Sequence, residues 1–291
     1  MQVLVTGATG HVGRIVVEQL VAAGVRVRAM TRRPQEARFP NSVETVSGDL
    51  ADPASLAPVL AGVDRMYLFP LAQTARKVVA LARQAGVQRV VVLSSAAVTS
   101  GADTTFHLPV EQAVESLCPE WTHVRPGEFM LNKLFLWGPS IRTEGAVYEP
   151  FPDAAWWPVH EHDVADVAVT ALLRDGHQGK AYNLSGPQLL TRREQVGAIA
   201  AAIGRAVRLE VVTPQQARER YRREGGFAAA HADFLLGFAD YQGGRREPTS
   251  VSYPAARGAG PRPTAQDVTG HPARTFAQWA RDHAAELRTQ W

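Results

Sequence analysis

Three glycines near the start of the chain, Gly7, Gly10 and Gly13, have the spacing of a phosphate-binding turn. Apolar residues 3–5 precede them, and apolar side chains recur every three or four positions over residues 12–23. This pattern predicts a buried strand, a tight turn and an amphipathic helix. Backbone N–H groups at such a turn, together with the helix N-terminus, attract a pyrophosphate. The segment therefore predicts a dinucleotide-binding site, and a glycine-rich turn without a ligand is the alternative.

A pair of arginines follows the next predicted strand, at residues 25–30. Arg32 stands about 20 residues beyond Gly13, where a unit that binds NAD carries an acidic residue for the ribose 2′-hydroxyl. A guanidinium at this place instead binds a 2′-phosphate by charge-assisted hydrogen bonds, whereas a carboxylate would repel it. Arg32, with Arg33 beside it, therefore predicts NADPH/NADP rather than NADH/NAD. Two surface arginines without a ligand are the alternative.

Further strands are predicted at residues 43–46, 66–69 and 89–93, with helices between them. Apolar strands that alternate with helices indicate a parallel sheet covered on both faces, and ligands bind such sheets beyond the carboxyl ends of the strands. Asp49, at one of these ends, can accept a hydrogen bond from an adenine amino group. The predicted cofactor contacts are Gly7, Thr9, Gly10, His11, Val12, Gly13, Arg32, Arg33, Asp49, Leu50, Phe69, Pro70, Leu71, Ser94, Ser95, Pro126, Gly127 and Phe129.

The composition is typical of a globular enzyme, because 45% of the 291 residues are hydrophobic and 20% are charged. The only cysteine, Cys118, allows no internal disulfide and fits a reducing cytoplasm. The first strand begins too early for a signal peptide, and no apolar run approaches the ~20 residues of a membrane span. Arginines at 218, 220, 222 and 223 predict a solvated helix face. We expect a cytoplasmic monomer or weak homodimer that binds a small, aromatic molecule and neither nucleic acid nor membrane.

The chain predicts an α/β fold, a Rossmann doubly wound parallel sheet with a smaller mixed α/β C-terminal lobe. Residues 1–150 form the predicted NADP-binding domain, to which residues 160–186 return. Residues 187–291 form the predicted substrate-binding or lid lobe. The lobe includes a predicted helix over residues 227–241 and a Gly/Pro-rich loop at residues 243–263, and it ends with a helix over residues 275–287.

Several motifs together resemble the NmrA-like group of atypical short-chain dehydrogenases. They are TGATGHVG at residues 6–13, GDL at 48–50, VVLSS at 91–95, VRPGEFMLN at 124–132, VHEHDVAD at 159–166 and TGHPARTF at 269–276. The resemblance covers nearly the whole chain and is weakest at residues 215–262. It implies an NADP-binding Rossmann domain with a small lobe over the nicotinamide. The group contains both reductases and redox sensors without catalysis, so the fold alone does not determine the function.

The proton-donating pair of most short-chain dehydrogenases, Tyr-xxx-Lys, is absent. None of the three lysines has a tyrosine four positions earlier. Where the resemblance places the pair, the chain has His107 and Glu111, as in the group's quinone and triphenylmethane reductases. The family's catalytic serine falls on Ala96. The usual proton relay is therefore excluded, and catalysis would depend on holding the cofactor against an electrophilic carbon.

His107 and Ser95 are the candidate catalytic residues. His107 titrates in the range of a general acid or base, and its alternative role is to orient the cofactor or to begin its helix. Ser95, at a strand end, fits a hydrogen bond to cofactor or substrate better than an acid. The proton can also come from water or from a hydroxyl group of the substrate.

Three functions fit these observations. The first is an NADPH-dependent reductase of a ketone or quinone-like substrate, aromatic or polyketide. The second is a non-catalytic NADP(H) sensor that binds a partner protein, and the third is an isomerase or dehydratase that uses the cofactor transiently. No metal is expected, because His160, His162 and Asp163 enter a helix in a structural segment of the family. Phe151 and the pair at residues 156–157 are core residues or the wall of a pocket for an aromatic substrate.

Overall fold

The computed structural model describes residues 1–248 and 264–288. The chain forms two compact units, and it passes from one to the other after Pro126, earlier than the boundary at residue 150 predicted from the sequence. Unit 1 comprises Met1–Pro126, Glu161–Leu184 and Ala265–His271, and unit 2 comprises Gly127–His160, Ser185–Thr264 and Pro272–Trp291.

Unit 1 is built on a parallel sheet of seven strands. They are β1 (Gln2–Val5), β2 (Arg26–Thr31), β3 (Val43–Ser47), β4 (Arg65–Leu68), β5 (Arg89–Leu93), β6 (Glu120–Pro126) and β9 (Lys180–Leu184). Their order is β3-β2-β1-β4-β5-β6-β9. The direction of winding reverses at β1, because β1 pairs with β2 on one side and with β4 on the other. In such doubly wound sheets a ligand binds at the carboxyl end of the strands beside this switch point.

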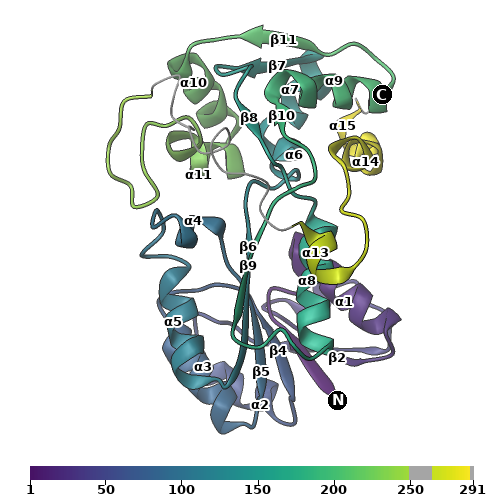
Figure 1. Cartoon of the computed structure of the whole chain (residues 1–291), viewed down its shortest axis with the longest axis vertical. Helices are drawn as coiled ribbons and strands as arrows, with labels where there is room; N and C mark the ends of the chain where they lie inside the picture. The colour runs from purple at the N-terminus through teal and green to yellow at the C-terminus, as the bar shows by residue number, and fades with distance from the viewer. Residues whose placement is uncertain (249–263, 289–291) are drawn as a thin grey trace. The chain divides into compact units, whose positions relative to one another are not determined.

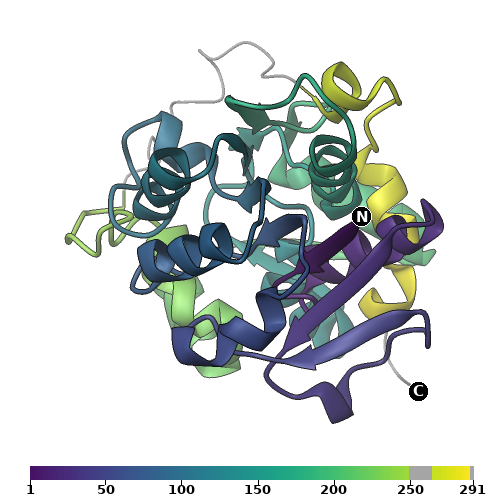
Figure 2. The same ribbon diagram turned by 90° about the horizontal axis from the view of Figure 1, so that it is seen from below.

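Helices cover both faces of this sheet. They are α1 (His11–Ala22), α2 (Ala57–Leu60), α3 (Ala75–Gln84), α4 (Ala96–Thr99), α5 (Leu108–Leu117), α8 (Glu161–Leu173) and α13 (Ala265–Thr269), with short 3₁₀ turns η1 (Pro34–Glu36) and η2 (Pro53–Leu56). Helix α1 packs on α8, and α3 packs on α5. Figures 1 and 2 show the two pairs on opposite sides of the sheet. The predicted Rossmann fold is confirmed.

The apolar periodicity of the sequence accounts for this packing. Val12, Ile15, Val16 and Leu20 are the buried face of α1, as their spacing predicts. On the other side of the sheet, one hydrophobic cluster joins strands β1, β4 and β5 to α3 and α5. The central strands β1, β4 and β5 are buried along nearly their whole length and are mostly apolar, whereas the edge strands β3 and β9 are more exposed and more polar.

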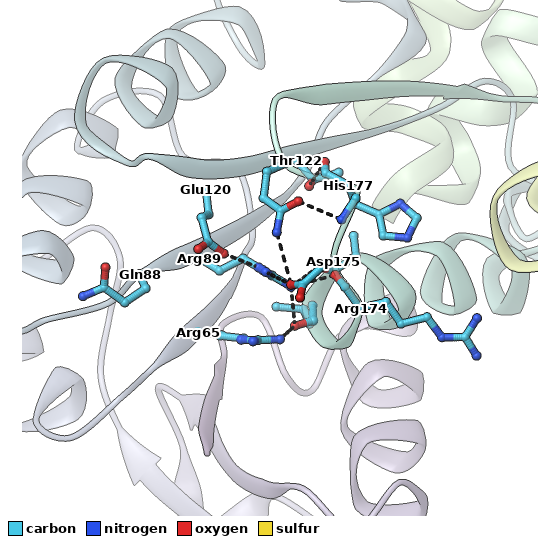
Figure 3. Close-up of polar contacts among 12 residues, drawn as sticks. Arg65, Gln88, Arg89, Glu120, Thr122, Arg174, Asp175 and His177 are labelled. Carbon is cyan, nitrogen blue, oxygen red and sulfur yellow. Dashed lines mark hydrogen bonds and ion pairs between the residues drawn. The ribbon is translucent and has the colours of Figure 1, made fainter.

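Arg89 holds the amino end of this sheet to the C-terminus of α8 (Figure 3). Its side chain is 3% exposed, and its guanidinium donates to Glu120 and Asp175 at 2.7 Å each. It also donates to the carbonyl of Arg174 at 2.7 Å, and Arg65 donates to the carbonyl of Leu172. These donors satisfy carbonyls that a helix end leaves unpaired. The cluster lies at the sheet edge opposite the glycine turn, so its role is structural.

Unit 2 contains two small sheets and a set of helices around its own apolar core. Strand β7 (Ala146–Glu149) pairs in parallel with β11 (Arg208–Val211), and β8 (Ala155–Trp156) pairs antiparallel with β10 (Leu190–Thr191). The helices are α6 (Asn132–Leu136), α7 (Gly138–Glu144), α9 (Arg192–Ile203), α10 (Pro214–Glu224), α11 (Gly226–Leu235), α14 (Phe276–Asp282) and α15 (Ala284–Leu287). Capping boxes begin α9, α10 and α14.

Two predicted helices are shorter than expected. Helix α11 ends at Leu235 rather than at residue 241, because Gly237 adopts a positive φ of 80° that stops the helical path. The last helix breaks at His283 into α14 and α15. Most of the predicted loop at 243–263 lies outside the described residues. Within the described ranges, no helix combines the length and the apolar character needed to cross a membrane.

Candidate active site

The glycine turn at the carboxyl end of β1 has the geometry of a phosphate cradle. Gly7 has a φ of +60°, and Gly10 donates its N–H to the carbonyl of Gly7 at 2.9 Å. A Cβ on Gly13 would lie 2.2 Å from the Gly7 oxygen, and one on Gly10 would lie 3.1 Å from it. A side chain at Gly13 is therefore excluded, and one at Gly10 would make a tight contact with the Gly7 carbonyl. Gly10 is the N-cap of α1 and has no side chain to cap it, so this helix start suits an anionic ligand.

Thr6 connects this turn to the end of β4. Its buried hydroxyl donates to the carbonyl of Tyr67 at 3.0 Å and accepts from the N–H of Phe69 at 2.8 Å. The ring of Phe69 lies against Gly7, where a Cβ would meet it at 3.1 Å. Thr6 is not among the site residues predicted from the sequence. In the sequence, Thr6 could have been identified as a site residue by its position between a buried strand and the first glycine of the turn.

The two arginines after β2 differ in their surroundings. Arg33 is 74% exposed and forms an ion pair with Glu36 at 3.2 Å. Arg32 is exposed and has no ion-pair partner among the described residues. Thr31 shapes the turn, because its hydroxyl accepts from the N–H of Arg33 at 3.2 Å. Of the two, Arg32 has the guanidinium that is not already paired with a carboxylate.

Asp49 and Leu50 follow β3 at the same edge. One oxygen of the half-buried Asp49 carboxylate accepts from the N–H of Ala51 at 2.9 Å. The side chain of Leu50 belongs to the hydrophobic cluster of unit 1, and its carbonyl accepts from the Thr74 hydroxyl at 2.7 Å. The structure therefore holds Asp49 at the edge, as predicted, and turns the Leu50 side chain into the core.

A buried ion pair ties together the ends of β5 and β6. Glu111 on α5 is 1% exposed and accepts from Arg125 through both oxygens, at 2.8 and 2.5 Å. Ser94 donates to the same carboxylate at 2.5 Å. Burial raises the pKa of Glu111, but the hydrogen bonds from Arg125 and Ser94 and the nearby charges together outweigh this effect and lower the pKa overall. Arg125 also donates to the hydroxyl of Thr99, at 3.0 Å.

His107 stands at the start of α5 beside a fully buried carboxylate. Its Nδ1 lies 2.5 Å from Asp103, which also accepts from the backbone N–H of His107 and Phe106. Burial lowers the pKa of His107 and outweighs the opposite effect of Asp103. Burial alone would raise the pKa of Asp103, but the hydrogen bonds from Phe106 and His107 lower it. The ring is thus neutral near pH 7, with its proton on Nδ1 and a lone pair on Nε2.

Comparison with known proteins places this geometry in a family. The NAD(P)H-binding family matches residues 7–175. The chain belongs to this family. It is 39% identical over 290 residues to a (4-alkanoyl-5-oxo-2,5-dihydrofuran-3-yl)methyl phosphate reductase of Streptomyces griseus, with 97% of this chain and 98% of that protein covered. NmrA, a negative transcriptional regulator solved in complex with NADP, has the same fold, with a TM-score of 0.69 at 19% identity.

Two further matches show an oxidoreductase family of this fold. An NAD(P)H azoreductase of Xenophilus azovorans is 32% identical over 306 residues, with 97% of this chain and 98% of that protein covered. The structure of the Citrobacter sp. triphenylmethane reductase complexed with NADP(H) superposes with a TM-score of 0.78 at 22% identity, over 98% of this chain and all of that one. The protein is thus an NAD(P)H-dependent oxidoreductase.

Two strand-end serines have different tasks in this member of the NAD(P)H-binding family. Ser94 is buried and committed to Glu111. Ser95 is half-buried and is the N-cap of α4, where its hydroxyl accepts from the N–H of Ala97 at 3.2 Å. An accepting hydroxyl keeps its own hydrogen for donation, so Ser95 can still hydrogen-bond a ligand.

The predicted contacts after β6 lie on both sides of the division between units. Pro126 ends β6 in unit 1, whereas Gly127 and Phe129 belong to unit 2. Phe129 forms an isolated bridge with Val159, and the N–H of Met130 donates to Val159 at 2.9 Å. Backbone pairing therefore fixes this segment within unit 2.

Unit 2 contains a polar cavity of about 40 Å³, which we call the Lys133 cavity. Lys133 is 2% exposed and donates to Glu128 at 2.6 Å, and Arg192 donates to the same oxygen at 2.6 Å. Burial and repulsion from Arg192 lower the pKa of Lys133 to about 8, although Glu128 opposes them. Phe151 and Trp156, predicted to form a pocket wall, line this cavity. Glu128 and Lys133 are not among the site residues predicted from the sequence.

The residues considered for a metal do not gather. Among the described residues, the one group of three close ligand types is Glu111, Glu115 and His123. Glu111 is already held by the guanidinium of Arg125, which repels a cation. His160 belongs to unit 2 and lies 3.5 Å from Asp282.

Proposed function

We propose that the protein is an NADPH-dependent reductase that reduces an electron-poor conjugated acceptor, such as a quinone or a conjugated ketone. The observation that carries the proposal is the missing proton relay, because none of the three lysines follows a tyrosine by four positions. An isolated ketone becomes an alkoxide when it accepts a hydride, and it needs a strong proton donor. A conjugated acceptor spreads the negative charge over several atoms and needs less help.

The named relatives support this choice. A 4-alkanoyl-5-oxo-2,5-dihydrofuran has a ring double bond conjugated to a lactone carbonyl and to a ketone. An azoreductase acts on a nitrogen–nitrogen double bond, which is conjugated in aromatic azo compounds. Both acceptors delocalise the charge that a hydride brings. Because these relatives are named as reductases, they favour an NADPH-dependent reductase over an NADP(H) sensor or an isomerase. The aromatic substrate, the cytoplasmic location and the monomer or weak homodimer stay predictions.

The chain's own residues would bind and orient the reactants. The cradle of Gly7, Gly10 and Gly13 would hold the pyrophosphate of the cofactor, and Arg32 would hold its 2′-phosphate. The chemistry that bound NADPH supplies is a hydride from its dihydronicotinamide ring. His107, whose lone pair is on Nε2, would accept a hydrogen bond from cofactor or substrate rather than donate a proton. Ser95 would donate a hydrogen bond at the same edge.

Consumption of NADPH, followed as loss of dihydronicotinamide absorbance, tests the proposal. We expect turnover with 1,4-naphthoquinone, with an azo dye and with a 2-acylbutenolide, and none with cyclohexanone, whose carbonyl is isolated. Equal rates with cyclohexanone would show that a proton relay exists after all. Failure of every acceptor, at concentrations where the protein binds NADPH, would favour the sensor.

Cofactor preference gives a second test. Arg32→Ala removes the unpaired guanidinium, and a hydrogen bond to a charged group contributes about 1.5–3 kcal/mol, so the Kd for NADPH should rise roughly 10- to 100-fold. The Kd for NADH should stay within about twofold of the wild-type value, because NADH has no 2′-phosphate. Fluorescence titration of the reduced cofactors measures both.

Arg26→Ala is the matched control, because Arg26 is exposed at the opposite end of the same strand. It should change neither affinity. Equal weakening of NADPH and NADH by Arg32→Ala would refute the role of Arg32 in binding a 2′-phosphate.

A further inference from the structure

The Lys133 cavity contains hydrogen-bonding groups that the chain does not satisfy. Both Lys133 and Arg192 donate to Oε1 of Glu128. The other oxygen, Oε2, is buried and accepts no hydrogen bond from the described residues. Within the part of the chain that the structure describes, the Lys133 ammonium donates one hydrogen bond, to Glu128, although it has three hydrogens to donate. The cavity therefore holds one unused acceptor beside unused donors.

Leaving such groups unpaired is costly. A buried polar group without a partner destabilises a protein by about 1–3 kcal/mol, and by more if it is charged. Buried polar atoms are almost always paired, with protein, water or ligand. The unused groups of Glu128 and Lys133 therefore require a partner beyond the described residues, such as water or a ligand.

The walls of the cavity are apolar and aromatic. Phe151, Trp156 and Leu235 line it, and the ammonium of Lys133 lies 4.5 Å from the centre of the Trp137 ring. A volume of about 40 Å³ takes a group of a few heavy atoms or a few water molecules. An apolar wall with a few converging polar groups is typical of a site for a small organic molecule.

The charges of the cavity favour a neutral ligand. Lys133 and Arg192 contribute two positive charges to the cavity. Glu128 and Glu149 contribute two negative charges, and each carboxylate interacts electrostatically with both cations. A phosphate or carboxylate ligand would add a negative charge that nothing in the cavity compensates. A neutral group that both accepts and donates satisfies the site without this cost.

We propose that the Lys133 cavity binds a carbonyl compound that carries a hydroxyl group next to its carbonyl. The carbonyl oxygen accepts from Nζ of Lys133, and the hydroxyl donates to Oε2 of Glu128. The rest of the molecule packs on Phe151 and Trp156. The inference concerns the cavity of unit 2 alone and does not depend on the proposed function.

Three related ketones test the inference on the wild-type protein without cofactor. The probes are hydroxyacetone, its methyl ether methoxyacetone, and acetone, which are small enough for a cavity of about 40 Å³. Isothermal titration calorimetry or ligand-observed NMR gives their Kd values. We expect the hydroxyketone to bind about tenfold more tightly than the ether, which leaves Oε2 of Glu128 unpaired. Equal affinities for hydroxyketone and ether would overturn the inference and leave the cavity to water.

Variants locate the binding. Lys133→Met keeps the length of the side chain and leaves Glu128 paired with Arg192. It removes the donor to the carbonyl, so it should weaken binding of the hydroxyketone and the ether alike. The double variant Glu128→Gln/Lys133→Met also removes the carboxylate that accepts from the hydroxyl and should abolish the preference, while thermal unfolding verifies that it is folded. Arg193→Met is the matched control, because Arg193 is 55% exposed and pairs with Asp153. A preference that survives in the double variant, or affinities that Lys133→Met leaves unchanged, would place the ligand elsewhere and refute the inference.

The two proposals fail separately. If naphthoquinone oxidises NADPH but the ketones bind without preference, the reductase stands and the hydroxy-carbonyl site is refuted. If the hydroxyketone binds as expected but no acceptor oxidises NADPH, the cavity stands as a binding site and the reductase is refuted.

Discussion

Gly13→Ala should weaken NADPH binding by roughly 100-fold or more, because the turn would lose two or more hydrogen bonds to the charged pyrophosphate. The added Cβ would lie 2.2 Å from the carbonyl oxygen of Gly7 and 2.9 Å from its carbon. Backbone atoms cannot move aside as a flexible side chain does. The first turn of α1 must therefore shift away from the loop, and the converging N–H groups separate. Titration with NADPH measures the loss, and NADH should be weakened equally, since both cofactors share the pyrophosphate.

Gly197→Ala is the control for an added methyl group. Gly197 lies exposed within α9, and nothing lies within 4 Å of the position that a Cβ would take there. Alanine in a helix interior should raise the free energy of unfolding by about 0.5–1 kcal/mol and leave both cofactor affinities unchanged. Wild-type NADPH affinity in the Gly13 variant would show that the cofactor does not bind at this turn.

Arg125→Met should lower the free energy of unfolding by about 3–5 kcal/mol at pH 7, because it leaves the buried charge of Glu111 without its partner. In the wild-type protein Arg125 holds the pKa of Glu111 below its usual value. Without Arg125, burial raises that pKa above the unfolded value. The loss should then be largest at neutral pH and smaller as the pH falls toward 5, where the variant can protonate Glu111. Urea unfolding at pH 7 and pH 5 measures both effects.

Arg14→Met provides the matched comparison. Arg14 is 61% exposed and lies 3.9 Å from Glu18, so its replacement should change stability by less than about 1 kcal/mol at either pH. A loss in the Arg125 variant that does not depend on pH would mean that lost packing, and not the buried charge of Glu111, causes it.

The sequence alone determined most of the cofactor half of this protein. The spacing of Gly7, Gly10 and Gly13 predicted the turn, since only a residue without a Cβ allows the close approaches found there. The period of apolar side chains predicted the buried face of α1 and the buried strands, because burial depends on local periodicity. The position of Arg32 directly after β2 could also be predicted from the sequence, because it depends only on the length of one strand–helix–strand unit.

Only the tertiary structure decided which polar side chains meet. Glu111 and Arg125 come from a helix and a strand, and nothing local in the sequence pairs them. Asp103 fixes the proton of His107 on Nδ1, which changes His107 from a candidate acid to an acceptor.

The Lys133 cavity depends still more on the fold. Glu128 and Arg192 are 64 residues apart in the sequence. Arg192 and Lys133 both donate a hydrogen bond to the same carboxylate oxygen of Glu128. The periodicity and spacing of residues predict structure within one helix, strand or turn. A cavity is formed by side chains from elements that are distant in the chain. For this reason the sequence predicted where the cofactor would bind, and the packing of unit 2 decided which polar groups meet in the Lys133 cavity.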